Sequence, residues 1–159
     1  MKVGLYAGSF DPFTNGHLNI IERSLSLFDE IHIVIAVSPL KKSLFTDLER
    51  EKMLNELFAK NKNIKIRKWS GLIVDYAKNN NVNFLIRGLR PTGDFEVEFQ
   101  MASMNKKIYK DIETFFLMTE DDHYFISSSL VKEIHGHGGD ISPFVPSIIH
   151  SYLAGDKSE

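Results

Sequence analysis

The chain has 159 residues, 43% of them hydrophobic and 25% charged, which is typical of a globular protein with one domain and a sizeable core. Its 19 basic and 21 acidic residues leave a formal charge of −2, which argues against general binding to nucleic acid or to a membrane surface. The chain contains no cysteine, so disulfides and thiolate chemistry are excluded.

The first predicted strand and helix enclose the strongest motif. Residues 2–7 are apolar and prone to β structure, and a helical spacing of apolar residues covers 16–28. Between them lie Gly8, the hydroxyl of Ser9 and the run Thr14-Asn15-Gly16-His17. A helix that begins after small and polar residues offers free backbone N–H groups and a partial positive charge to an anion, above all to a phosphate. This segment therefore predicts a phosphate-binding loop.

The rest of the chain alternates strands and helices. Further strands are predicted at residues 31–37, 64–68, 82–86 and 114–118, and further helices at residues 46–59, 72–77, 93–109, 127–134 and 146–153. This alternation predicts a single α/β domain over residues 1–159, with a doubly wound, five-stranded parallel sheet and a tail at 156–159 that frays. Ligands of such sheets bind at the carboxyl ends of the strands.

Polar side chains follow most of these strands. Ser9 and His17 follow the first strand, Lys41 the second, Arg87 and Arg90 the fourth, and Ser127, Ser128 and Ser129 the fifth. An imidazole in the first helical turn could donate a hydrogen bond to a phosphate oxygen. Its charge state stays open, because a helix terminus lowers its pKa and a bound polyphosphate raises it. Arginine offers a planar fork for phosphate, and hydroxyls at a helix start can form a second anion site.

Plainer interpretations stay open for several of these groups. Lys41 and the two arginines could be solvated loop charges, and one serine is expected to cap its helix. Glu133, His135, His137 and Asp140 look like a metal-binding set, but the glycines among them favour a mobile loop. Residues 121–123 are expected to form an exposed loop.

The predicted helix at residues 93–109 carries both aromatic and acidic residues. Phe95 and Phe99 recur at helical spacing and are predicted to face the core. Asp94 and Glu96 are expected on the solvated side of this helix. Glu98 lies on a flanking face, where it could reach a ligand, although spacing alone favours a solvated carboxylate.

The chain lacks the sequence signatures of several enzyme classes. The chain has no G-x-G-x-x-G, no P-loop and no G-x-S-x-G sequence, which disfavours dinucleotide oxidoreductases, kinases and serine hydrolases. No apolar run approaches the roughly 18 residues that span a bilayer, and the apolar start is too short for a signal peptide. We therefore expect a cytoplasmic protein that binds neither nucleic acid nor membrane.

Three blocks of sequence can be compared with known families. They are Tyr6-x-Gly8-Ser9-Phe10-Asp11-Pro12-x-Thr14-Asn15-Gly16-His17, then Ile86-Arg87-Gly88-Leu89-Arg90 with Asp94-Phe95-Glu96-x-Glu98, and Phe125-Ile126-Ser127-Ser128-Ser129-Leu130-Val131-Lys132-Glu133. The first block alone indicates the nucleotidylyltransferase superfamily. Together, over nearly the whole chain, the blocks resemble the phosphopantetheine adenylyltransferases of coenzyme A synthesis, which implies a Rossmann-like nucleotidylyltransferase fold.

The resemblance implies a reaction and a set of site residues. The adenylyl group of ATP would pass to 4′-phosphopantetheine, giving dephospho-coenzyme A and pyrophosphate, with Mg²⁺ carried by ATP. His17 would be catalytic, as the stabiliser of the transition state at the α-phosphate. Phosphopantetheine would contact Ser9, Lys41, Ile73 and Arg87. ATP would contact Ser9, Phe10, His17, Gly88, Leu89, Arg90, Glu98, His123, Tyr124, Phe125, Ile126, Ser127, Ser128 and Ser129. A homohexamer and feedback by coenzyme A are also implied.

Three positions depart from the family pattern. Ser9 stands where threonine is usual, and it keeps the hydroxyl. Val97 stands where some members have an aromatic residue and His123 where a tryptophan can occur, so the contacts near adenine differ.

Two alternative functions remain. The first block also suits a nicotinate-mononucleotide or cytidylyl transferase, which the block at 86–90 and the short chain disfavour. A regulatory module that senses ATP or coenzyme A without turnover is disfavoured because His17, both arginines and the serines are all present. Transfer to an acceptor that is already a phosphate oxyanion needs positioning and charge neutralisation rather than a strong base.

Overall fold

Five parallel strands form one sheet in the order β3-β2-β1-β4-β5. The computed structural model describes residues 1–38, 42–91 and 94–155. The strands are β1 Val3–Gly8, β2 Glu30–Ala36, β3 Ile64–Trp69, β4 Phe84–Leu89 and β5 Glu113–Met118. The predicted class, an α/β fold with a doubly wound five-stranded parallel sheet, is confirmed.

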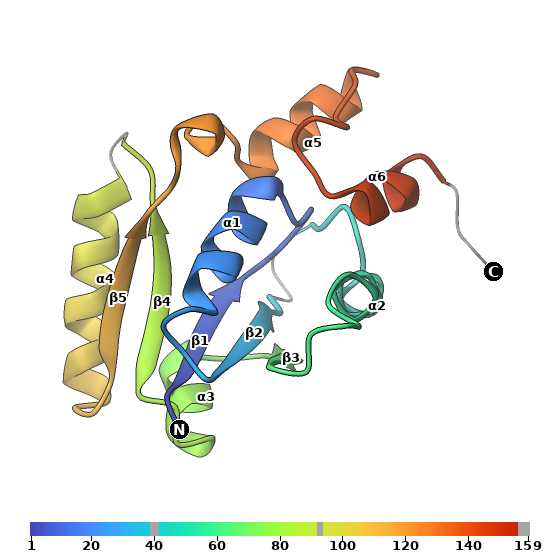
Figure 1. Ribbon diagram of the computed structural model, residues 1–159. Coiled ribbons are helices and arrows are strands. Elements are labelled where there is room, and N and C mark those ends of the chain that lie inside the picture. The colour runs from blue at the N-terminus through green and yellow to red at the C-terminus, as the bar shows by residue number, and fades with distance from the viewer. Residues whose placement is uncertain (39–41, 92–93, 156–159) are drawn as a thin grey trace.

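Helices cover both faces of this sheet (Figure 1). They are α1 Asn15–Ser24, α2 Asp47–Leu57, α3 Ile73–Asn79, α4 Asp94–Ile108, α5 Ser128–Gly136 and α6 Ser147–Leu153, with a short 3₁₀ helix, η1, at Asp121–His123. Helices α1, α2, α5 and α6 supply apolar side chains to the core on one face, and α3 packs on the other face. Helix α4 lies beside β5 at the edge of the sheet (Figure 1).

The central strands are buried on both faces, as their apolar runs predict. In β2, Ile31, Ile33 and Ile35 belong to the core cluster under α1 and α2, whereas Val34 belongs to the cluster under α3. Successive side chains of a strand point to opposite faces, so a strand between two helical layers carries mostly apolar residues. The buried exception in β2 is His32, which is hydrogen-bonded to Glu30 and Tyr76. The β-branched run therefore marks a strand in the middle of the sheet.

Two element ends differ from the predictions by three or more residues. Strand β4 runs to Leu89, so Arg87 and Gly88 lie on the strand, opposite Phe116 and Leu117 of β5, and not in the loop after it. Pairing with a neighbouring strand overrides the low β-propensity of glycine here. Helix α1 ends at Ser24, four residues early, and a turn continues the chain. The predicted start of α4 at residue 93 and the tail at 156–159 lie outside the described residues.

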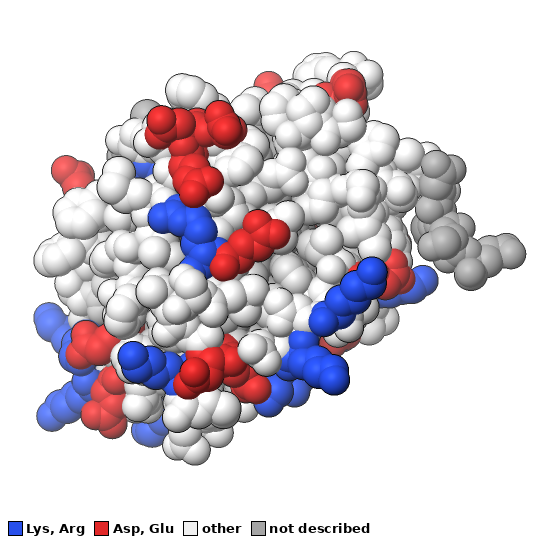
Figure 2. Space-filling model, viewed as in Figure 1, with Lys and Arg blue, Asp and Glu red and all other residues white. Residues whose placement is uncertain are grey.

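The surface carries charges of both signs. Figure 2 shows Lys and Arg side chains interspersed with Asp and Glu on the viewed face. None of the helices in the described part of the chain is both long and apolar enough to cross a membrane.

Candidate active site

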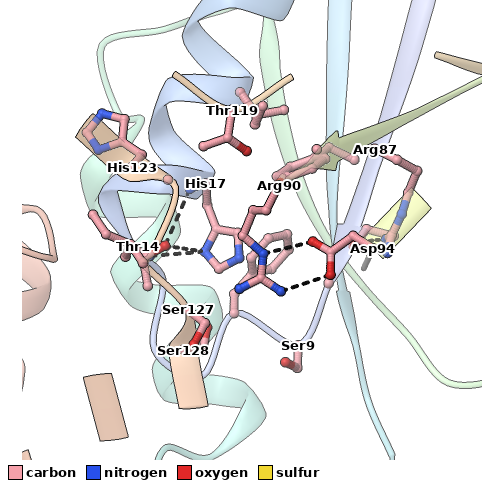
Figure 3. A pocket seen from close by; sticks show the side chains of 18 of the residues that line it. Ser9, Thr14, His17, Arg87, Arg90, Asp94, Thr119, His123, Ser127 and Ser128 are labelled. Carbon is pink, nitrogen blue, oxygen red and sulfur yellow. Dashed lines mark hydrogen bonds and ion pairs between the residues drawn. The ribbon is translucent and has the colours of Figure 1, made fainter. Parts of the chain in front are cut away.

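A cavity of about 350 Å³ lies at the carboxyl ends of β1 and β4 (Figure 3). These strands are neighbours, and the chain leaves them toward opposite edges of the sheet, β1 toward β2 and β4 toward β5. Such a switch point is where doubly wound sheets bind ligands. The predicted site residues that line the cavity are Ser9, Phe10, His17, Arg87, Gly88, Arg90, Glu98, His123, Ile126, Ser127 and Ser128.

Other predicted site residues lie elsewhere. Leu89, Tyr124, Phe125 and Ser129 belong to the same elements and loops but are not part of the cavity wall, and Phe125 is 82% exposed. Ile73 begins α3 and packs on the opposite face of the sheet from α1. Lys41 lies outside the described residues.

The N-terminal cap of α1 holds the imidazole of His17. Thr14 is the N-cap residue; its hydroxyl accepts a hydrogen bond from the backbone N–H of His17 at 3.4 Å, and its own backbone N–H donates to His17 Nδ1 at 3.0 Å. Because the backbone N–H is only a donor, Nδ1 must carry a lone pair, so Nε2 carries the proton of the neutral ring. The Thr14-x-x-His17 spacing is thus a capping box in which histidine replaces the usual glutamate.

The surroundings of His17 favour its neutral form. Burial first, and then the positive charges of Arg90 and Arg87, lower the pKa of His17 to about 4. The ring also contacts Phe10 and Phe13, with ring centroids 5.2 and 5.3 Å away. Burial, the two arginines and the Thr14 cap thus all favour a neutral His17 that donates through Nε2.

Two glycines bring neighbouring elements close together at the cavity. A β-carbon at Gly8 would lie 3.0 Å from the ring of Phe10, and a β-carbon at Gly88 would lie 3.1 Å from Cγ1 of Ile20. Both distances are shorter than ordinary carbon–carbon contacts. The aromatic side chain therefore packs directly on the end of β1, and α1 packs directly on β4.

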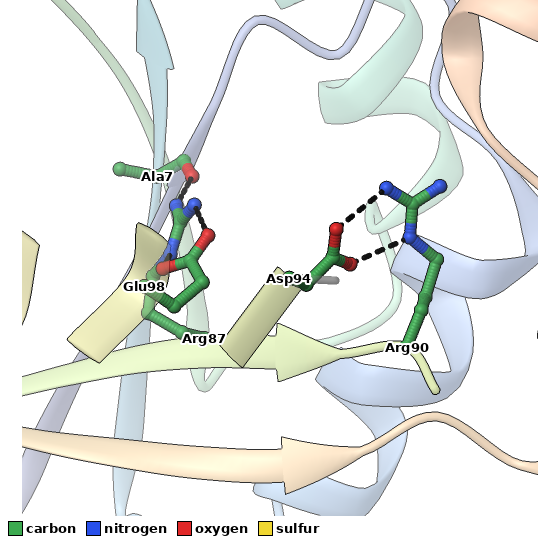
Figure 4. Close-up of polar contacts among 5 residues, drawn as sticks. All are labelled: Ala7, Arg87, Arg90, Asp94 and Glu98. Carbon is green, nitrogen blue, oxygen red and sulfur yellow. Dashed lines mark hydrogen bonds and ion pairs between the residues drawn. The ribbon is translucent and has the colours of Figure 1, made fainter. Parts of the chain in front are cut away.

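Both arginines of β4 are held by carboxylates of α4 (Figure 4). Arg87 donates through Nε to Glu98 Oε2 at 2.7 Å and through Nη2 to Glu98 Oε1, while its Nη1 donates to the carbonyl of Ala7 at 3.1 Å. Arg90 donates to both carboxylate oxygens of Asp94, at 2.8 and 3.3 Å. Each fork is bidentate, the strongest geometry available to an arginine.

The start of α5 forms another part of the wall. Ser127 is the N-cap, and its hydroxyl accepts from the backbone N–H of Leu130 at 3.1 Å, which confirms that a serine caps this helix. The hydroxyl of Ser128 donates to the carbonyl of Pro12 at 2.8 Å. Ser129 is exposed and lies outside the cavity wall, so two of the three serines, rather than all three, reach the candidate anion site.

Predictions for α4 were partly wrong. Asp94 is half-buried, lines the cavity and pairs with Arg90, because the arginine four residues earlier attracts it from the solvated side. Glu98 likewise pairs with Arg87. Phe95 and Phe99 are 57% and 56% exposed and do not join the core. Helical spacing identified an apolar stripe, but it could not tell whether the same chain covers it.

Some wall residues were not predicted at all. Thr119 is buried and directly follows β5, so the rule that found the other polar groups after strands could have found it. Tyr6 also lines the cavity, and burial raises the pKa of its hydroxyl. Nothing in the apolar sequence of β1 marks this tyrosine. Within the described chain, Nδ1 of His123 is buried without a hydrogen-bond partner.

The carboxylates of the cavity decide whether a metal ion could bind there. In residues 1–38, 42–91 and 94–155, no three His, Asp or Glu side chains gather as a metal-binding group. Two carboxylates, Asp94 and Glu98, line the cavity. Mg²⁺ keeps several water ligands and is often held by substrate phosphates with one or two carboxylates. The cavity therefore fits a Mg²⁺ ion that arrives on a polyphosphate.

Comparison with known proteins gives consistent matches. Residues 5–134 match the family model described as cytidylyltransferase-like. The chain is 50% identical to the phosphopantetheine adenylyltransferase of Carboxydothermus hydrogenoformans, over 96% of this chain and 94% of that protein. It is 43% identical to the one from Heliobacterium modesticaldum, over 97% and 92% of the two chains, and 47% identical to the one from Clostridium tetani, over 94% and 93%.

A solved structure shares the fold. A putative nicotinate-nucleotide adenylyltransferase from Vibrio parahaemolyticus superposes with a TM-score of 0.68, covering 97% of this chain and 99% of that one. The two sequences are only 17% identical, so this likeness concerns the fold alone.

Proposed function

The chain belongs to the phosphopantetheine adenylyltransferases, and on this premise we propose how the cavity at the β1–β4 junction works. The enzyme transfers the adenylyl group of ATP to 4′-phosphopantetheine, which gives dephospho-coenzyme A. In the proposed step, a phosphate oxygen of phosphopantetheine attacks the α-phosphorus of ATP in line with the leaving group. The bond from that phosphorus to the bridging β-phosphate oxygen breaks, and pyrophosphate leaves.

The observation that carries this mechanism is the fixed tautomer of His17. The Thr14 cap occupies Nδ1, so Nε2–H is the group that can donate to an α-phosphate oxygen. Negative charge on that oxygen increases in the transition state, and a pre-oriented donor stabilises it most there. The attacking oxygen is already ionised, so the step requires no general base.

The two faces of the sheet suggest how the substrates divide the site. Side chains alternate along β4, so Arg87 shares a face with Leu85, which packs in the same cluster as Ile73 of α3. Gly88 faces Ile20 of α1 on the other side. We therefore assign phosphopantetheine to the α3 side, with Arg87 and Ile73 and with Lys41 by resemblance.

ATP is assigned to the α1 side of the sheet. Its proposed contacts are Phe10, His17, Gly88, Leu89, Arg90 and the segment 123–129. Ser9, at the tip of β1, lies between the two sides and would contact both substrates. Glu98 is paired with Arg87, so we place it where the two substrates meet.

Mg²⁺ would accompany ATP, with Asp94 and Glu98 as the carboxylates available in the cavity. When bound, the metal neutralises phosphate charge as a Lewis acid. Arg90, freed from Asp94, would then bind the phosphates that leave. We also propose a cytoplasmic location, because the reaction consumes ATP, and feedback by coenzyme A, because that molecule contains both the phosphopantetheine and the adenylyl parts of the product.

The proposed homohexamer finds support in α4. Its large apolar residues Phe95, Val97, Phe99, Met101, Met104 and Ile108 are all more than half exposed. Val97, Met101, Met104 and Ile108 follow one another at spacings of four, three and four residues, so they share one face of α4. An exposed apolar face of this kind marks a contact with another chain. The number six follows from the resemblance alone. Sedimentation would test the contact: Met101→Asp should give smaller assemblies than the parent chain. Assemblies of unchanged size would show that this face of α4 is not the contact.

Pyrophosphate release tests the function. We expect release only when ATP and 4′-phosphopantetheine are both present, with dephospho-coenzyme A identified by mass. Replacing ATP with CTP, or the acceptor with nicotinate mononucleotide, should abolish turnover. Preference for either substitute would overturn the assignment, and tight nucleotide binding without turnover would favour the regulatory alternative.

A further inference from the structure

Asp11 is a buried carboxylate that takes no direct part in the proposed reaction. It lies in the loop between β1 and α1, its side chain is 5% exposed, and it is not part of the cavity wall. A buried ionised carboxylate is unfavourable unless it is paired and hydrogen-bonded. Its contacts therefore indicate what it contributes.

The carboxylate of Asp11 joins three segments that are far apart in sequence. Oδ2 accepts from the backbone N–H of Leu44 at 2.8 Å, and Oδ1 accepts from the backbone N–H of Phe45 at 2.9 Å. The ammonium of Lys132, on α5, lies 3.3 Å from Oδ2. One side chain thus connects the loop after β1, the segment before α2 and the helix whose start lines the cavity.

Neighbouring residues of this loop are tied to the same helices. The carbonyl of Ser9 accepts from Nη1 of Arg50, a buried residue of α2, at 2.6 Å. The carbonyl of Pro12 accepts from the hydroxyl of Ser128 of α5 at 2.8 Å. Two residues after Pro12 comes Thr14, the cap that orients His17. The loop that sets the imidazole is therefore held between α2 and α5.

We propose that Asp11, with Lys132 as its counter-charge, is a positioning residue that fixes the distance between His17 and the Ser127–Ser128 wall. This inference rests on the proposed function of His17. A carboxylate suits the role because it accepts from two backbone N–H groups and one ammonium at once. An asparagine has nearly the same shape but only one accepting oxygen, and its amide nitrogen would face a donor.

Two substitutions and a control test the role. Asp11→Asn removes the charge and one acceptor, and Lys132→Met removes the ammonium but keeps the aliphatic length. Lys52→Met is the matched control. The ammonium of Lys52 also pairs with a carboxylate, that of Glu56 at 3.8 Å, but the Lys52 side chain is 61% exposed and does not line the cavity. We expect Asp11→Asn to lower kcat by about tenfold to 100-fold, Lys132→Met to lower it less, and the control to leave it unchanged.

A double-mutant cycle separates positioning from a structural role. If Asp11 acts through His17, Asp11→Asn should lower kcat by less than about twofold when His17 is already alanine. An equal loss in both backgrounds, or a lower melting temperature with unchanged kcat, would overturn the proposal. Lys132→Met provides the same cycle if Asp11→Asn does not fold.

Nitrogen NMR of His17 gives a readout that does not require turnover. In the parent chain at neutral pH, we expect the Nε2–H tautomer with Nδ1 as acceptor. Asp11→Asn and Lys132→Met should shift the signals toward a mixture of tautomers. Unchanged signals would refute the positioning role even if the parent enzyme proved inactive, whereas an inactive parent enzyme with shifted signals would refute only the proposed reaction.

Discussion

The two walls of the candidate active-site cavity are organised differently. The wall made by the β1–α1 loop and α5 is fixed by backbone and buried polar contacts, and among the described residues Nε2 of His17 has no hydrogen-bond partner. The wall made by β4 and α4 carries two arginines whose forks are engaged by carboxylates. In the proposed mechanism, the first wall contacts the substrate without rearranging, whereas the arginines of the second wall must exchange their carboxylate partners for substrate phosphate.

Removal of His17 should have the largest effect. His17→Ala deletes the donor of the fixed wall, and loss of one such donor costs about 2.7–4 kcal/mol, or about 10²–10³ in kcat. The fold should persist, because the Thr14 hydroxyl can still cap the helix. Steady-state kinetics and circular dichroism measure the two outcomes. Near-normal turnover would show that the fixed wall is not where the transition state is stabilised.

Arg87→Ala should act mainly on substrate affinity. A charged hydrogen-bonding group is worth about 1.5–3 kcal/mol, so we expect KM for phosphopantetheine to rise by about tenfold to 100-fold. The kcat and the KM for ATP should change less. If KM and kcat are both unchanged, Arg87 is not part of the substrate site.

Glu98→Gln should change phosphopantetheine affinity in the opposite direction. The neutral amide holds Arg87 less strongly, so the guanidinium becomes more available to a substrate phosphate. We expect the Kd for phosphopantetheine to fall by about twofold to fivefold, which corresponds to roughly 0.5–1 kcal/mol. Isothermal titration with phosphopantetheine alone measures this. A weaker affinity would mean that the ion pair prepares Arg87 for the substrate instead of competing with it.

The smallest effect concerns pH. Because the pKa of His17 is lowered to about 4, the imidazole stays neutral as pH falls from about 8 to about 5, well past the usual value near 6.5. We expect kcat/KM to show no break near pH 6.5. The free energy of unfolding should decrease as pH falls from about 6.5 toward 4, because the unfolded chain binds a proton that the folded chain does not. His17→Asn should lack that part of the decrease.

How far the sequence predicted the fold depends on the region. The β-branched run of β2 specified a central strand, because only a strand with two covered faces needs such a run. The run Thr14-Asn15-Gly16-His17 likewise predicted a helix start with an imidazole in its first turn, after the carboxyl end of β1. Both signals are local, so they did not depend on distant contacts.

Around α4 the sequence was less informative. The apolar residues Phe95 and Phe99 indicated a helix face but not what covers it. The prediction that Asp94 lies on the solvated side was wrong, because its partner Arg90 lies before the helix. The buried Nδ1 of His123 gains its surroundings only when η1 reaches the cavity. Such contacts between distant segments leave no periodic pattern in a single chain.

Gly88 lets α1 pack closely on β4 at the wall of the cavity. Helix α1 rests on β4 where that strand has no side chain, with Ile20 one helical turn beyond His17. A methyl group at position 88 would push against Ile20 and displace this part of α1 from β4. Because His17 lies one helical turn before Ile20, the same displacement would move its imidazole away from Arg87 on β4.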